Sequence, residues 1–433
     1  MQPQRHLLLL SYYWHPDSGT GVNRIAKMAH YLHVLGWHIT VLTATSEPLP
    51  EDHQAGWQVV RVPGFKLSQL WGGRKSPAPK EAGFSPSLFY KRDKSLKEKL
   101  LIWARLNLLV PDAKIGWYPS AVKKGKELLQ NQHFDAILST SPPPTVALVA
   151  RRLARFSGRP WTADFRDPWT QIYYYETFPP GALAGWLNRQ LESKVVRSAH
   201  NLVVVNRGFF PQPEAAARQT VIPNGYDPRD FAGSTFGRRP NENPEALEMK
   251  YIGTLKMNQL APGFLRALER LYRERAHLKR QPRFEFVGAV DEQYRALLET
   301  AAPGFSMGFP GRVSHAEAIA KMQAADMLLL FIGRAARSKS VYSTKLFEYL
   351  RTGRPILAMA HEDGAAAEVI QDCEAGFCAG HEAEEATYGY LKALLNGAEI
   401  PAGAAPEKIK KYSFETLAAE LNKVLHRDLN PPK

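Results

Sequence analysis

Apolar runs alternate with amphipathic stretches along most of this chain. Residues 6–12 form an apolar run, residues 22–35 place apolar side chains at the helical period, and residues 37–44 are a second run rich in β-forming residues. This order predicts a strand, a helix and a strand, with Gly36 as the C-cap of the helix. A β-α-β unit of this kind crosses right-handed in nearly all proteins.

The same alternation continues beyond residue 130. It predicts two parallel sheets, each covered by helices on both faces, with ligands bound where the strands end. Further strands are expected at 134–140, 159–165, 201–206, 249–253, 283–288, 305–309, 327–331, 355–360 and 376–378, and helices at 146–156, 187–198, 262–274, 291–300, 316–324, 343–352 and 413–425.

The length of 433 residues favours two domains. Residues 233–244 are rich in Gly, Pro, Asn, Arg and Ser, a composition typical of a linker. The expected division is an N-terminal domain over 1–225, an interdomain segment and linker over 226–247, a C-terminal domain over 248–410, and a terminal helix over 411–433 that packs back on the N-terminal domain.

Bulk properties narrow the class of protein. The composition, 44% hydrophobic and 23% charged, is that of a globular chain. No apolar run reaches the roughly 18 residues that a membrane span needs, and the apolar stretch near the start is too short for a signal-peptide core. The two cysteines form no metal-binding or disulfide pattern. We therefore expect a cytoplasmic protein with reduced thiols.

The net charge of +14 favours an anionic partner. Between Lys91 and Lys126 there are ten basic residues and three acidic ones, with apolar side chains at roughly helical spacing among them. Such a helix either lies on anionic headgroups or packs its apolar side on its own domain, and the sequence leaves both open. Binding through region 91–126 would make the protein peripheral at the inner face of the plasma membrane. No nucleic-acid-binding signature accompanies the charge, so no nucleic-acid partner is expected.

Residues 340–353 are the first candidate for chemistry. Ser343 and Thr344 suit the start of a helix that Gly353 closes. The free N–H groups of that N-terminus can bind a diphosphate, and Glu348, one turn further, can accept hydrogen bonds from two ribose hydroxyls. A capped surface helix with no ligand has the same pattern.

The loop over residues 164–169 is the second candidate. It holds Asp164, Arg166 and Asp167 at the end of a predicted strand, where ligands of parallel sheets bind. We expect Asp167 to orient a substrate hydroxyl and Arg166 to meet a phosphate. A local ion pair that stiffens the turn is the alternative.

The motifs together resemble a known family. The run STKLFEYLRTGRPILAM is similar to the donor-binding segment of the retaining glycosyltransferases of family 4, which have the GT-B fold. LLLLSYYWHPDSGTGVNRIAKMAHYLHVLGWHITVLTA resembles that family's opening unit, VIPNGYDPRDF its interdomain segment, and FVGAV with GFPGRVSHAEAIAKMQAADMLLL its base-binding region. In this order the segments cover most of the chain. The resemblance implies an α/β protein with two Rossmann-like, doubly wound domains that face each other across a cleft.

The resemblance also implies roles for single residues. Glu348 matches the second Glu of the family's E-x7-E motif and would hold the ribose of the donor nucleotide. The main chain at the start of the same helix would face the diphosphate, the loop after the strand at 305–309 would pack on the base, and a glycine loop in the first domain would let backbone approach the phosphates. The residues at these positions are Ser343, Thr344 and Lys345, then Arg312 and Val313, then Gly19 and Gly21.

The chain departs from the family at two positions. Ser340 stands where the first Glu of E-x7-E contacts the transferred sugar, so the sugar contact must differ. The family often has an Arg after the Gly of the second domain's first strand and a Lys further on, both for phosphate. Here that turn reads Gly253-Thr254-Leu255-Lys256, which leaves Lys256 as the candidate.

The expected function is therefore glycosyl transfer in surface-polysaccharide biosynthesis. A hexose-like sugar would move from a nucleotide-sugar donor to a glycan or lipid-linked acceptor with retention of configuration, without a metal and without a cofactor other than the donor substrate. The absence of an Asp-x-Asp pair agrees with a metal-independent reaction. The catalytic candidates are Asp167, Arg166 and Asp164. The alternatives are a non-catalytic subunit that binds a sugar nucleotide, or a sugar-nucleotide epimerase on the same fold.

Overall fold

The computed structural model of the chain divides into two compact units. Unit 1 comprises Met1–Pro223 together with Glu415–Lys433, and unit 2 comprises Asn224–Phe414. The described residues are 5–17, 20–44, 53–54, 57–64, 95–172, 175–176, 178–207, 209–210, 213–233, 236–237, 244–427 and 429.

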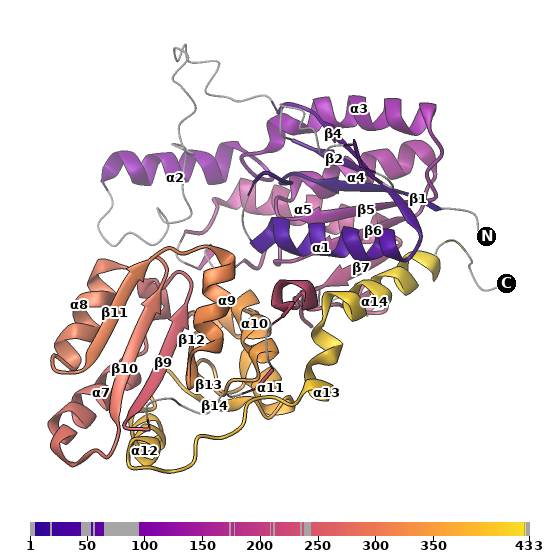
Figure 1. Cartoon of the computed structure of the whole chain (residues 1–433). Helices are drawn as coiled ribbons and strands as arrows, with labels where there is room; N and C mark the ends of the chain where they lie inside the picture. Colours follow the sequence, from indigo (N-terminus) through magenta and orange to yellow (C-terminus); the bar gives the residue numbers. More distant parts are fainter. Residues whose placement is uncertain are drawn as a thin grey trace. The chain divides into compact units, whose positions relative to one another are not determined.

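Unit 1 is built on an eight-stranded sheet of the order β3-β4-β2-β1-β5-β6-β7-β8 (Figure 1). All neighbouring strands pair in parallel except the short edge pair of β3 and β4. The strands are β1 (Arg5–Ser11), β2 (Trp37–Thr43), β3 (His53–Gln54), β4 (Trp57–Arg61), β5 (Ala136–Ser141), β6 (Trp161–Phe165), β7 (Asn201–Val204) and β8 (Gln219–Val221).

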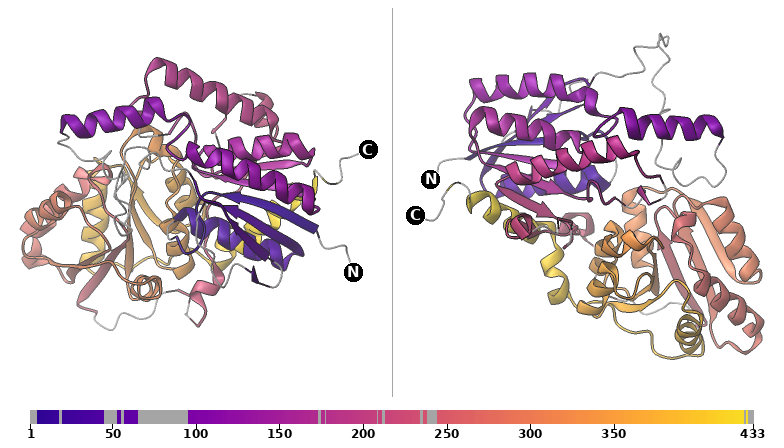
Figure 2. Two further views of the ribbon diagram at one scale, coloured as in Figure 1. Left: turned by 90° about the horizontal axis from the view of Figure 1, so that it is seen from above. Right: turned by 180° about the vertical axis from the view of Figure 1, so that it is seen from behind.

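Helices cover both faces of this sheet (Figures 1 and 2). On one face, side chains of α3, α4 and α5 pack in one cluster with β1, β5 and β6. On the other lie α1 and α14, and α14 is held by a 2.7 Å hydrogen bond from the indole of Trp37 to Asn422. The helices are α1 (Thr20–Val34), α2 (Leu96–Leu108), α3 (Tyr118–Asn131), α4 (Thr145–Ser157), α5 (Ala182–Ser198), α6 (Pro213–Ala216) and α14 (Phe414–Arg427).

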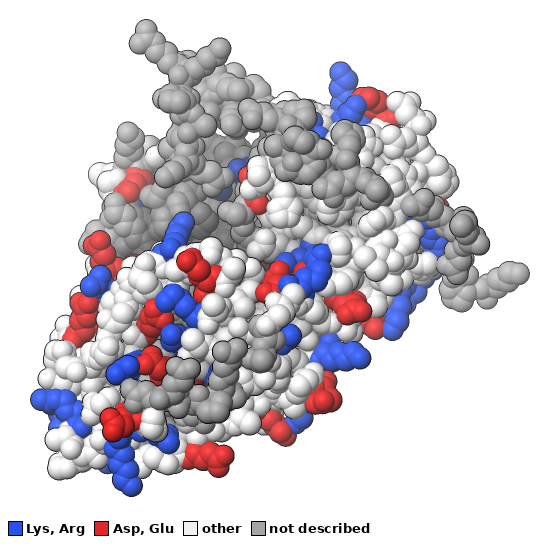
Figure 3. Space-filling view, viewed as in Figure 1, with Lys and Arg blue, Asp and Glu red and all other residues white. Residues whose placement is uncertain are grey.

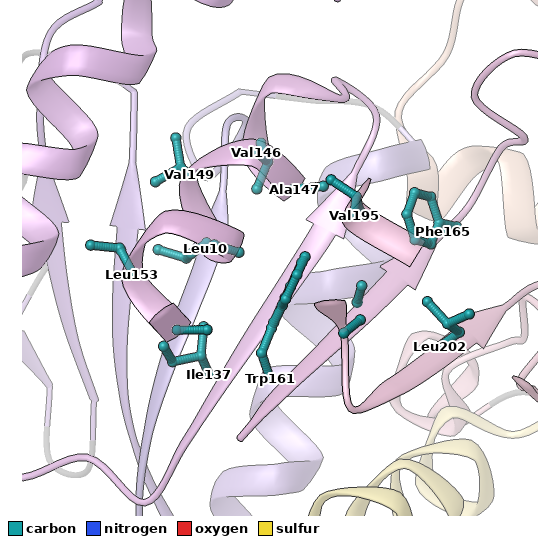
Figure 4. Close-up of a cluster of buried hydrophobic side chains, with 14 of the residues drawn as sticks. Leu10, Ile137, Val146, Ala147, Val149, Leu153, Trp161, Phe165, Val195 and Leu202 are labelled. Carbon is teal, nitrogen blue, oxygen red and sulfur yellow. The ribbon is translucent and has the colours of Figure 1, made fainter. Parts of the chain in front are cut away.

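The central strands are apolar on both faces because both faces are covered. Leu7, Leu8, Leu9 and Leu10 of β1 are all fully buried. Figure 4 shows the side chains of α4 directed at Leu10 and at the strands beside it. Burial of this kind supplies most of the free energy of folding.

Unit 2 contains a six-stranded, wholly parallel sheet of the order β11-β10-β9-β12-β13-β14. One face packs on α7, α8 and α12, and the other on α9, α10 and α11. The strands are β9 (Ala246–Ile252), β10 (Gln281–Val287), β11 (Ser306–Gly311), β12 (Met327–Phe331), β13 (Ile356–Met359) and β14 (Gly376–Ala379), and the helices are α7 (Pro262–Arg273), α8 (Glu292–Ala301), α9 (His315–Gln323), α10 (Thr344–Thr352), α11 (Ala365–Asp372), α12 (Glu384–Leu395) and α13 (Pro406–Ile409).

The predicted elements occur in the expected order, with ends shifted by a few residues. The two Rossmann-like sheets confirm the predicted fold class. The strands and α-helices that the prediction did not include are β3, β4, β8, α3, α6, α11, α12 and α13. None of the described helices is long and apolar enough to cross a membrane.

The segment expected as a linker, residues 226–247, lies within unit 2. Tyr226 forms a β-bridge with Ser413, and Phe231 is buried in the core of this unit. These two aromatic side chains lie before the polar stretch 233–244 and provide apolar area that fixes residues 226–231 on unit 2. In the terminal region, residues up to Phe414 belong to unit 2, and the rest of α14 belongs to unit 1.

Candidate functional site

At the carboxyl edge of the sheet in unit 1, Asp164 is buried and paired. Its Oδ1 lies 3.2 Å from Nη2 of Arg24, and its Oδ2 accepts a 2.7 Å hydrogen bond from Thr140. Arg24 also donates to the carbonyl of Ile222 at 2.8 Å. Because both carboxylate oxygens are engaged inside the fold, Asp164 ties α1 to β6 and to the segment after β8. This geometry fits a positioning role better than the expected catalytic one.

Arg166 follows β6 and lies against α1. Its guanidinium donates to the carbonyls of Ser141 at 3.2 Å and Pro142 at 2.7 Å, while Nη1 is buried without a hydrogen-bond partner in the described part of the chain. A Cβ atom on Gly21 would lie 2.2 Å from that Nη1. Gly21 is therefore needed because the guanidinium occupies the space where a side chain would be. The other glycine of the expected loop, Gly19, is outside the described residues.

Asp167 differs from Asp164 in having no such partners. Its side chain is partly buried, and no described residue donates a hydrogen bond to its carboxylate. Burial raises the pKa of Asp167 above its ordinary value, and the charge of Arg166 acts in the opposite direction. A desolvated carboxylate with unused acceptor capacity is suited to bind a substrate hydroxyl.

The turn from Pro111 to Trp117 has a structural task in the same unit. Asp112 accepts hydrogen bonds from the N–H and the hydroxyl of Thr145, at 2.7 and 2.8 Å, and so caps α4. Lys114 lies 5.1 Å from the ring centroid of Tyr12 and 5.6 Å from that of Tyr13. These tyrosines follow β1 and were not among the predicted site residues, because a Tyr pair after an apolar strand also fits a packed core.

In unit 2, the side chain of Lys345 reaches from α10 to the end of β9. Its ammonium contacts the hydroxyl of Tyr251 and the carbonyl of Thr254, and lies 4.3 Å from the ring centroid of Tyr251. Gly253 has a φ of +127°, and a Cβ there would lie 2.3 Å from Cε of Lys345. The missing side chain of Gly253 thus makes the slot for Lys345.

This environment changes the ionisation of Lys345. Desolvation lowers its pKa to about 7; Glu348 raises the pKa, and the charge of Lys256 lowers it further. The pKa of Lys256 itself is lowered by burial. Two lysines therefore lie close enough to repel each other, an arrangement that a bound anion would relieve.

Lys345 is in the first turn of α10, next to the N-terminus of that helix. Ser343 is the N-cap residue, but its hydroxyl makes no capping hydrogen bond. The first N–H groups of a helix have no partner in a preceding turn, and Thr344 and Lys345 carry two of them. This helix end therefore combines free donors with the ammonium of Lys345.

Glu348 lies one turn further along α10 and contacts α9. Its Oε1 is 3.1 Å from Nε2 of His315, and its side chain is 24% exposed. His315 therefore orients this carboxylate. Arg312 is exposed just before α9, whereas Val313 packs on the apolar core. These residues lie at the same edge of the sheet as α10.

Ser340 ends the short helix η9 (Ala336–Ser340), where the family pattern has a Glu. Its hydroxyl donates to the carbonyl of Arg337 at 3.1 Å. The neighbouring Lys339 forms a 2.6 Å ion pair with Asp363.

Comparisons with known proteins agree with the fold. Residues 19–225 match the family model "Glycosyl transferase 4-like domain". Anabaena HepE in complex with UDP and glucose has a TM-score of 0.59 at 12% identity, covering 97% of this chain and 99% of that one. A glycosyltransferase from Rickettsia africae has the same TM-score and identity, covering 99% and 100%. The lipopolysaccharide outer core galactosyltransferase WaaB has a TM-score of 0.57 at 11% identity, covering 98% and 99%. A comparison with curated proteins gives no match.

The two Rossmann-like sheets have the architecture of the GT-B fold. Residues 19–225 match the glycosyl transferase 4-like domain family, in agreement with the resemblance seen in the sequence. The identities to solved structures are low, so those likenesses show the shared fold.

The contact between Gly21 and Arg166 is testable by stability measurements. Gly21→Ala forces the guanidinium to leave its two carbonyl partners, and we expect a loss of about 1–3 kcal/mol in the free energy of unfolding. In an Arg166→Met background the same substitution should cost clearly less, because the crowding atom is gone. Gly389→Ala is the control, since a Cβ there meets no atom within 4 Å. Equal costs of Gly21→Ala in both backgrounds, from urea denaturation, would contradict the contact.

Proposed function

We propose that the chain transfers a sugar from a nucleotide-sugar donor to a glycan or lipid-linked acceptor, with retention of configuration and without a metal ion. The observation that carries the donor part is the position of Lys345. Its ammonium is buried at the end of β9, beside the N-terminus of α10 and close enough to Lys256 for the two charges to repel each other. A site with two cations and free N–H donors is complementary to a diphosphate.

The remaining donor contacts extend along α9 and α10. Glu348 would accept hydrogen bonds from the two hydroxyls of the ribose, in the orientation that His315 gives to its carboxylate. The base would pack on the backbone around Arg312 and Val313, at the start of the turn into α9. These roles are supported by the order of the residues along one edge of the sheet.

The chemistry requires that negative charge on the departing diphosphate be stabilised as the bond to the sugar breaks. The ammonium of Lys345 and the N–H groups of Thr344 and Lys345 would supply that stabilisation without a metal. In a retaining reaction of this kind a phosphate oxygen of the donor takes the proton of the acceptor hydroxyl. The protein then needs to hold the two substrates close, and no protein nucleophile is required.

In unit 1, Asp167 is the residue we assign to the acceptor hydroxyl, because its carboxylate is desolvated and has no hydrogen-bond donor in the described fold. Arg166 would bind a phosphate or a sugar oxygen beside Asp167, with its buried Nη1 atom as the hydrogen-bond donor. Asp164 would help to position Asp167 and Arg166 indirectly, because its ion pair with Arg24 fixes α1 against β6.

The acceptor class follows from analogy with the solved structures. One similar protein is described as a galactosyltransferase of the lipopolysaccharide outer core, so a hexose-like sugar and a surface polysaccharide are the proposed setting, with the protein on the cytoplasmic side. A non-catalytic subunit that binds a sugar nucleotide is the second candidate, favoured by Ser340. Transfer or hydrolysis of a donor by the purified protein would exclude it.

The donor site is tested by a panel of nucleotide sugars with different bases and sugars, screened by thermal shift. At least one should raise Tm, and Glu348→Gln should weaken its binding about tenfold or more, because a charged acceptor for the ribose hydroxyls is lost. The control is Glu368→Gln, a change of an exposed carboxylate on α11. If no donor raised Tm, the function would be wrong; if Glu348→Gln bound like the wild type, the ribose role would be wrong.

Lys345 predicts a pH dependence of donor binding. The diphosphate of a nucleotide sugar keeps its charge between pH 6 and 8, whereas a lysine with a pKa of about 7 loses its proton over that range. Because the anion binds the protonated form, affinity should be full below pH 7 and fall about tenfold by pH 8. Calorimetry with Lys345→Met should show weaker binding and a flat profile. An equal slope in both proteins would contradict the role of Lys345.

A further inference from the structure

Exposed apolar side chains in unit 1 gather on two adjoining helices. Of the twelve large hydrophobic residues that are exposed among the described residues, seven lie on α2 and on the first five residues of α5. We call these seven the α2–α5 surface. Its members are Leu96, Leu100, Leu101, Trp103, Leu108, Leu183 and Trp186.

Helix α2 turns its apolar side outward. At 100° per residue, the positions of its five exposed apolar residues fall within an arc of roughly 160°. Ile102, on the opposite side, is 2% exposed and contacts the fold. Leu96 is 86% and Trp103 54% exposed. A helix on the surface of a globular protein has the reverse arrangement, with polar residues outward, so this surface indicates a partner.

The fold holds this surface in place. A reciprocal pair of hydrogen bonds between Ser95 and Glu98 caps the start of α2. Near its end, Asn107 accepts a 2.7 Å hydrogen bond from the N–H of Gly181, the N-cap residue of α5. That bond brings Leu183 and Trp186 next to the exposed side of α2, and Figure 2 shows the two helices in neighbouring positions.

Charges next to the surface are positive. Lys99 lies at one edge of the exposed arc of α2 and Arg105 at the other, and the exposed Arg189 follows Trp186 by one turn of α5. The acidic residue of α2, Glu98, lies outside the arc and caps the helix. By contrast, Lys, Arg, Asp and Glu are interspersed on the described surface seen in Figure 3.

We propose that the α2–α5 surface docks on an anionic phospholipid membrane, with α2 lying in the interface. Leucine and tryptophan side chains would enter the boundary between headgroups and acyl chains, while the flanking cations meet lipid phosphates. Lys99 and Arg189, which are both exposed, can extend their charged ends toward the headgroups. A partner of this kind explains an apolar centre with a cationic border better than a neutral protein surface does.

The α2–α5 surface includes only part of the basic region 91–126 that the sequence suggested for membrane binding. Lys91, Arg92 and Lys94 lie outside the described residues. On α3, Lys124 forms a 2.6 Å ion pair with Glu127, and Lys126 lies 4.9 Å from the ring centroid of Phe156. Lys124 and Lys126 of α3 therefore have partners within the fold, and α5 contributes apolar residues outside the expected range.

Flotation with lipid vesicles tests the proposal. The full chain should bind vesicles of phosphatidylcholine with 30% phosphatidylglycerol, bind much less to pure phosphatidylcholine, and be partly released at 1 M salt. Leu100→Ser with Trp103→Ser should weaken binding about tenfold or more, because two apolar side chains no longer leave water. Leu183→Ser with Trp186→Ser should have a similar effect.

Val34→Ser with Leu297→Ser is the matched control, since both residues are exposed on other helices. It should bind vesicles like the wild type. Equal binding to neutral and anionic vesicles, no binding at all, or unchanged binding of both double variants would overturn the proposal. Self-association in solution that the Leu100→Ser with Trp103→Ser variant abolishes would also overturn it, because the partner would then be a second copy. Donor-induced shifts of Tm should be the same in all variants, which separates this test from that of the donor site.

Discussion

Parallel strand pairing is the constraint on which both candidate sites depend. It brings the carboxyl ends of all strands of a sheet to one edge, and there the loops and helix N-termini meet. In unit 2 this edge places the end of β9 beside α10, so that the slot at Gly253 receives the side chain of Lys345. In unit 1 the same geometry places Arg166, after β6, against Gly21 of α1. Each glycine is required because a cationic side chain fills its place.

The two sites use charge in different ways. Arg24 and Asp164 in unit 1 neutralise each other in the interior, where an ion pair holds elements in register and offers little to a ligand. Lys345 has no carboxylate within ion-pair distance in the described structure, and its nearest contacts are a phenol and a carbonyl. The protonated form of Lys345 is therefore incompletely stabilised, and a bound diphosphate would supply the missing stabilisation. The cost of desolvating the lysine is thus partly recovered when the donor binds.

Much of the fold was predictable because buried parallel strands are nearly continuous apolar runs. The strand Met327–Phe331 was predicted to the residue, and α10 to within one. Short edge strands such as β8 were missed, since three residues carry no period. The apolar spacing of α2 was also visible, but a period cannot tell which side faces water. The structure shows that the apolar side faces outward.

The candidate site was predictable where a motif is local and not where partners are distant. Ser343, Thr344 and Glu348 lie within one helix turn or two, so their proximity follows from the sequence. The pairing of Asp164 with Arg24 joins residues 140 positions apart, and without it Asp164 resembled Asp167. The contact of Lys345 with Tyr251 spans 94 positions. Only the fold reveals that the side chain of this lysine, besides its main chain, points to the proposed diphosphate.

The most direct measurement of the central claim is the number of protons taken up when the donor binds. A lysine with a pKa of about 7 is half protonated at pH 7, so a diphosphate that contacts it should draw about half a proton from solution. Calorimetric titration with a nucleotide-sugar donor, in buffers of different ionisation enthalpy, gives this number. The account predicts an uptake near half a proton for the wild type and near zero for Lys345→Met. Binding of the donor to the wild type without proton uptake would contradict it.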